Sequence, residues 1–335
     1  MSNSTDIFNI VAASKTFYNY STYISFSIGL IGSILNILVF TNTKVFHQNR
    51  CAFYLVAESI FNIAQLTQNF ANTIWTLFLN GTDPTTVSLT WCKLRTCLPQ
   101  WYRLTLTAII CFAAIDQFLS TNPRLYLRQL SSLTIARYQV YFAIGFCLLH
   151  TIPAAVFIQI SSLFGCIVSN NGLINYYSFV FYPIISGLFP VCVSSLFSIL
   201  AYRNVRHIVR RQIPINRRRL DQQLTAMIFA RVIFYVILQL PFTIYRIYSL
   251  NMNIPKGNTI AYAIDRWIQA VVLVLAYLSH AINFYIFLLT SSRYRRQVKH
   301  FIIKTYEALA GWSCNDHHRV HPLDVTSCRS GAEFE

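Results

Sequence analysis

The sequence predicts an all-α fold, a seven-transmembrane helix bundle followed by a short amphipathic eighth helix. Three observations predict it. The chain has 335 residues, of which 55% are hydrophobic and only 11% charged, against about 25% charged in a typical soluble domain. The hydrophobic residues fall into seven runs, each long enough to cross a bilayer as a helix. The basic residues gather after the first, third, fifth and seventh runs.

The charge distribution indicates a membrane partner rather than a nucleic acid. The net charge of +16 comes from 27 Lys+Arg against 11 Asp+Glu, and many basic proteins bind nucleic acid. Here, however, the basic residues lie in short clusters between apolar runs, as the positive-inside rule describes. We therefore expect a multi-pass protein of the plasma membrane, with its N-terminus extracellular and its C-terminus in the cytoplasm.

The chain divides into four predicted regions. Residues 1–22 form a polar extracellular tail with no pattern of a cleavable signal peptide. Residues 23–290 hold the bundle, residues 291–305 alternate basic and apolar side chains as an interfacial helix does, and residues 306–335 form a cytoplasmic tail. The predicted spans are residues 23–40, 52–79, 92–118, 139–160, 176–202, 224–250 and 260–290. Glycosylation sequons begin at Asn3, Asn19 and Asn80.

Small and polar residues within the spans predict how the helices pack. Gly29 and Gly32 suit a close helix approach in lipid. Glu58 lies inside an apolar run, where an acid normally faces the bundle interior. We expect it to join a polar cluster at mid-membrane that also contains Asn36, Ser279 and Asn283.

Two further features leave alternatives open. Arg231, inside the sixth span, could pair with Asp116 at the end of the third span or extend towards the inner interface. Pro190 and Pro241 each remove a hydrogen bond from their helix and kink it, and such a kink could be a hinge or static.

Several short motifs, in order and at suitable spacing, resemble those of rhodopsin-like G protein-coupled receptors over about residues 23–304. The general look is that of an invertebrate neuropeptide receptor of the FMRFamide-receptor-like kind. The motifs are Gly32 to Asn36, Leu55 to Glu58, Asp116-Gln117-Phe118, the prolines Pro190 and Pro241, Asn283 to Phe287, and Tyr294.

The resemblance implies a disulfide and a set of switch residues. Cys92 matches the cysteine of the third helix, which would pair with Cys166 in an oxidising compartment, and Cys97 is the competing partner. Residues implied to serve G protein coupling and switching are Asp116, Gln117, Asp221, Pro241, Asn283 and Phe287. Gln117 departs from the pattern because it replaces the family's arginine, which puts coupling in doubt. Glu58 in place of aspartate makes sodium binding doubtful.

The predicted ligand site lies in the outer half of the bundle. Pro99 stands where amine receptors have an aspartate, and Tyr277 stands where opsins have their lysine, so neither ligand class is expected. The candidate ligand-binding residues are Gln100, Arg103, Tyr245, Arg246, Trp267 and Tyr277. Aromatic and guanidinium groups suit a ligand with carbonyls, rings or an acid, and peptides carry all three. Alternatively, Arg103 simply pairs with Glu58.

These patterns predict a receptor that transmits the binding of an extracellular ligand, a neuropeptide, to an intracellular G protein. The sequence contains no phosphate-binding glycine loop, metal-ligand cluster or nucleophile elbow, so we expect no enzyme activity, cofactor or metal. Two alternatives remain. One is a seven-helix orphan or chemosensory receptor without G protein coupling. The other is a small solute transporter, although the chain lacks the internal repeat that many transporters show.

Overall fold

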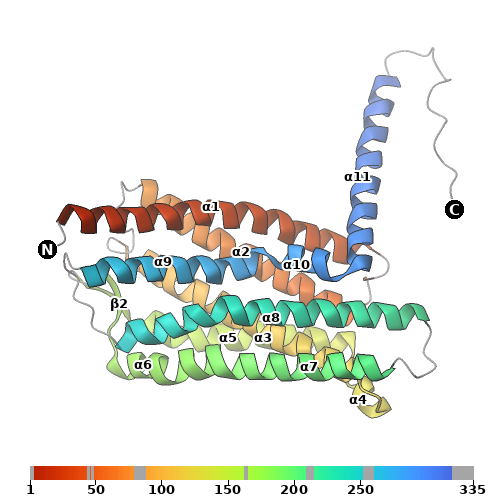
Figure 1. The fold of residues 1–335 in the computed structure, drawn as a ribbon, viewed down its shortest axis with the longest axis horizontal. Helices are drawn as coiled ribbons and strands as arrows, with labels where there is room; N and C mark the ends of the chain where they lie inside the picture. Colours follow the sequence, from red (N-terminus) through yellow and green to blue (C-terminus); the bar gives the residue numbers. More distant parts are fainter. Residues whose placement is uncertain are drawn as a thin grey trace.

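The computed structural model describes residues 4–43, 46, 49–78, 88–161, 165–208, 215–251 and 260–318. Long helices lie side by side in an elongated bundle (Figure 1). Its helices are α1 (Ser4–Asn42), α2 (Arg50–Phe78), α3 (Leu89–Thr121), α5 (Leu133–Phe157), η2 (Tyr177–Leu188), α7 (Phe189–Ile208), α8 (Ile215–Asn251), α9 (Ile260–Ala281) and α10 (Asn283–Thr290). Shorter or peripheral elements are α4 (Leu125–Gln129), β1 (Ile158–Ser161), β2 (Gly165–Val168), α6 (Asn171–Tyr176) and α11 (Ser292–His318).

The predicted seven-helix bundle is confirmed. Six of the described helical segments are long and apolar enough to cross a membrane, counting α6, η2 and α7 as one continuous span. The seventh is α2, which has 29 residues and packs against α1 and α3. Its polar side chains face inward, so its composition is less apolar although its length and position are those of a span.

A β-hairpin marks one end of the bundle, which we call the hairpin end; the opposite end, beside α4 and α11, is the α11 end (Figure 1). Strands β1 and β2 pair antiparallel, with Ile158 opposite Val168. A disulfide joins Cys166 on β2 to Cys92 in the first turn of α3, which confirms the predicted bond. Cys97, the alternative partner, is a free cysteine.

Three boundaries differ from the expected ones. Helix α1 begins at Ser4, well before residue 23, and contains the sequon residue Asn19. The seventh span is divided at Ile282, which separates α9 from α10 directly before Asn283. Helix α11 continues to His318 and lies crosswise to the bundle (Figure 1). The sequon residues Asn3 and Asn80 fall outside the described residues.

Close contact between α1 and α9 explains one glycine of the first span. A Cβ added at Gly29 would lie 2.9 Å from the Cα of Ala281 and 2.4 Å from Cδ1 of Leu66. The leucine can turn away, but the backbone of α9 can only move as a whole. The expected close packing at this position is therefore present, and it brings the seventh helix directly against the first.

We predict that Gly29→Ala destabilises the bundle by about 1–3 kcal/mol, the usual cost of an overpacked core. The added methyl group would force α1 away from α9. Thermal unfolding of the purified protein in detergent measures the effect. The control is Gly145→Ala, because a Cβ at Gly145 meets nothing within 4 Å. Equal stability of the two variants would contradict the prediction.

Candidate functional site

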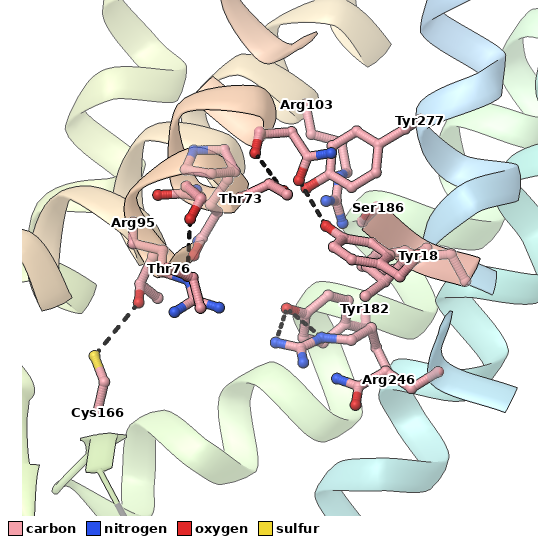
Figure 2. Close-up of a pocket in the computed structure, with 18 of the residues that line it drawn as sticks. Tyr18, Thr73, Thr76, Arg95, Arg103, Cys166, Tyr182, Ser186, Arg246 and Tyr277 are labelled. Atoms are coloured by element: carbon pink, nitrogen blue, oxygen red, sulfur yellow. Dashed lines mark hydrogen bonds between the residues drawn. The ribbon is translucent and has the colours of Figure 1, made fainter. Parts of the chain in front are cut away.

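A cavity of about 830 Å³ lies between the helices towards the hairpin end. Side chains from α1, α2, α3, η2, α8 and α9, together with Cys166 of β2, line it, as Figure 2 shows for ten labelled residues. Its volume falls in the range of small-molecule sites, which is about 300–1,000 Å³. Because every wall comes from a different helix, a ligand in this cavity would contact most of the bundle at once.

The wall from α3 follows one helical face. Thr96, Pro99, Gln100 and Arg103 line the cavity at spacings of three, one and three residues, which places them on one side of an α-helix. Gln100 donates from Nε2 to the Tyr177 hydroxyl at 3.1 Å. The guanidinium of Arg103 lies over the Phe242 ring, with 4.0 Å from Cζ to the ring centroid, so an aromatic face stabilises its charge.

The opposite wall joins η2 to α8. Arg246 of α8 donates from Nε and Nη2 to the hydroxyl of Tyr182 on η2, at 3.2 and 3.1 Å. The η2 segment is π-helical, a winding with i→i+5 hydrogen bonds. It places Phe181 and Ser186, five residues apart, on the same cavity wall.

Four of the six candidate ligand residues line this cavity: Gln100, Arg103, Arg246 and Tyr277. The other two do not. Tyr245 is one residue before Arg246, hence about 100° away around the helix, and its hydroxyl donates to Asp265 Oδ1 at 3.1 Å. Trp267 packs on Phe17 with ring centroids 5.6 Å apart.

A column of buried polar side chains on α2 runs from the cavity into the bundle, and only its member Glu58 was predicted from the sequence. Its members are Glu58, Asn62, Gln65, Asn69 and Thr73, and all are buried. Asn69 and Thr73 also line the cavity. Further along, a 3.0 Å hydrogen bond joins Asn62 Oδ1 to His280 Nδ1 of α9. Spacings of four, three, four and four residues are helical, so periodicity alone could have identified this polar face.

A buried ion pair ends the column. Arg231 Nε of α8 donates to Glu58 Oε1 at 2.6 Å, and Asn283 Nδ2 of α10 donates to the same oxygen at 2.8 Å. The side chains of Arg231 and Glu58 are 2% and 4% exposed. Both alternatives proposed for Arg231 were wrong, since it neither pairs with Asp116 nor extends outward. Arg103 does not pair with Glu58 either.

The expected mid-membrane polar cluster is divided. Only Asn283 joins Glu58, while Ser279 donates to the carbonyl of Ala276 in its own helix, at 2.8 Å. Asn36 instead accepts a hydrogen bond from the hydroxyl of Tyr294 on α11. Burial raises the pKa of that phenol well above its ordinary value, so it remains a donor. The positive charge beside Glu58, the residue at which sodium binding was in question, is the guanidinium of Arg231.

At the α11 end, Asp116 and Gln117 have separate partners. Asp116 accepts from the Ser131 hydroxyl at 2.5 Å and lies 4.0 Å from Nε of Arg50. Gln117 donates from Nε2 to the hydroxyl of Thr225 on α8 at 2.6 Å, so it joins α3 directly to α8.

The structure describes two of the remaining three switch candidates, Phe287 and Pro241, including their surroundings. Phe287 is buried, with its ring centroid 6.1 Å from that of Tyr294. Pro241 lies within α8 between Arg231 and Arg246. The side chain of Asp221 is outside the described residues.

Residues 130–305 match the family model described as serpentine type 7TM GPCR chemoreceptor Srw. The matched region is slightly more than half of the 335 residues and reaches from the end of α4 into α11. A search of curated proteins found no match to the chain.

We predict that Glu58→Gln lowers the free energy of unfolding by about 3–5 kcal/mol, because it leaves the Arg231 charge buried without a counter-charge. Arg231→Gln has the reciprocal effect. The double variant should be less destabilised than the two single effects added together, and a double-mutant cycle in purified, detergent-solubilised protein measures this coupling. Simple additivity would show that the pair does not interact.

Proposed function

The chain belongs to the Srw family of serpentine 7TM GPCR chemoreceptors, and on this premise we propose that it detects an extracellular peptide in the cavity at the hairpin end. The cavity carries the proposal. It combines amide, hydroxyl and guanidinium groups with aromatic rings, which are the partners that peptide carbonyls, amides and side chains require. Its volume suits a few residues of a peptide rather than a whole folded partner.

The proposed orientation places the hairpin end outside the cell and the α11 end in the cytoplasm. The Cys92–Cys166 disulfide lies at the hairpin end, and disulfides persist in oxidising, extracellular surroundings. At the other end, Arg203 and Arg206 are exposed near the end of α7, in agreement with the positive-inside rule. The G protein would then dock at the α11 end, with the receptor in the plasma membrane.

Helix α8 offers a mechanical connection between the two ends. It carries Arg246 in the cavity, Arg231 in the buried ion pair and Thr225 in the bond to α3. Pro241 interrupts its hydrogen bonding between the first two of these. The outer part of α8 could adopt two tilts relative to the rest of the helix. A ligand that binds more tightly to one of these two conformations would increase its population.

Gln117 gives specific support to a second candidate, a receptor that binds its ligand without G protein coupling. It replaces the arginine that rhodopsin-like receptors use for coupling. Gln117 nevertheless contacts α8, the helix that we propose connects the two ends, through Thr225. We propose that this hydrogen bond stabilises the resting arrangement of α3 and α8, so that coupling is retained.

The test is a second-messenger assay in transfected cells exposed to a peptide library. We expect at least one peptide to give a response, and Gln117→Ala to raise ligand-independent signalling about two- to tenfold, the effect of losing one hydrogen bond of about 0.5–1.5 kcal/mol. The control is Ser120→Ala, because the Ser120 hydroxyl donates only to its own helix, to the carbonyl of Gln117. Peptide binding without any response, in both the parent and the Gln117→Ala receptor, would favour the uncoupled alternative.

A further inference from the structure

Positive charge dominates the cavity walls. Lys15, Arg95, Arg103 and Arg246 line the cavity, from α1, α3 and α8. Among the residues that the structure describes, no aspartate or glutamate lines it. A cavity with this balance attracts anions and repels cations over several ångströms.

The carboxylates buried elsewhere in the described bundle are already occupied. Glu58 pairs with Arg231, Asp265 with Arg266, and Asp116 lies near Arg50. None of these pairs involves a cavity arginine. Neither Arg103 nor Arg246 therefore has a carboxylate partner among the described residues.

Arg103 and Arg246 retain unused hydrogen-bond donors. Nε of Arg103 is buried and has no hydrogen-bond partner among the described residues. Arg246 directs Nε and Nη2 to Tyr182, which leaves Nη1 outside these bonds. The two guanidinium groups are near enough for their like charges to act on each other. Both residues are half-buried, and taking part of a charged group out of water without a counter-charge is costly. An anion between them would offset that cost.

We infer that the cavity binds the carboxylate of an organic acid, held by Arg103 and Arg246. This rests on the proposed ligand site and narrows it to one chemical class. A guanidinium fork matches the two oxygens of a carboxylate. None of the described lining residues lies in the first turn of a helix, which is where backbone amides commonly gather around phosphates. The carboxylate belongs either to a small acid or to the free C-terminus of a peptide.

Matched acids and amides test the inference. Thermal unfolding of the purified full-length receptor is followed with aliphatic and aromatic acids of about four to ten carbons, and with tetrapeptides bearing a free C-terminus. Each acid is paired with its primary amide. We expect acids to stabilise the receptor at concentrations at least about tenfold lower than their amides, since charge-assisted hydrogen bonds are the stronger ones. Which set is effective, small acids or peptide acids, identifies the source.

Variants connect the preference to the two arginines. In Arg103→Gln and Arg246→Gln the advantage of acid over amide should be lost, whereas Arg103→Lys should keep part of it. The ligand-free melting temperature of Arg103→Gln should not fall, because a half-buried charge with no carboxylate partner among the described residues is removed. The control is Arg266→Gln, whose guanidinium is bound to Asp265 at 2.7 Å and does not line the cavity.

The outcomes separate this inference from the proposed function. If amides stabilise the parent receptor as well as acids do, or if Arg103→Gln keeps the preference, the carboxylate inference is wrong. If amidated peptides alone elicit second messengers, the receptor function stands and the carboxylate site fails. If acids stabilise the protein yet no compound elicits a signal, the carboxylate site stands and the signalling function fails.

Discussion

The ion pair between Glu58 and Arg231 is the constraint on which much of the bundle depends. Two charges at bilayer depth are costly unless they meet each other, and Glu58 and Arg231 do so directly. This requirement fixes the rotation of α2 and α8 and the depth at which they face each other. Asn283 donates to the same carboxylate oxygen and adds the start of α10 to the arrangement, directly after the break at Ile282.

The polar face of α2 has a related effect on assembly. A helix with Asn62, Gln65 and Asn69 on one side is a poor membrane span by itself, because lipid cannot satisfy amides. Packed against α1, α3 and α9, the same residues are buried and their face becomes an internal polar path. It joins the cavity, where Asn69 bonds to the Tyr18 hydroxyl at 2.7 Å, to the buried charges.

Most of the fold could be predicted from the sequence, and four of the six candidate ligand residues line the cavity. Hydropathy and loop charges were sufficient for the spans because they depend on residue order alone. The pairing of Arg231 could not be obtained that way, since it depends on which helices face each other at one depth. The position of Tyr245 could not be predicted for a similar reason. Its neighbour Arg246 lines the cavity, whereas Tyr245 faces another side of α8 and contacts Asp265. The start of α1 at Ser4 was missed because polar residues of the first turns carry no apolar pattern.

The π-helical winding of η2 has a consequence for how ligand preference could diverge among related receptors. At Gly187 a Cβ would lie 2.8 Å from the carbonyl oxygen of Tyr182, five residues earlier, so glycine is needed where the wide turns end. Deleting the extra residues that the wide turns of η2 contain would return it to α-helical winding, turning Phe181 and Tyr182 to new positions on the cavity wall. The packing of α7 and everything beyond it would keep its register. A short deletion or insertion in this segment would therefore change recognition while the signalling end of the molecule is inherited unchanged.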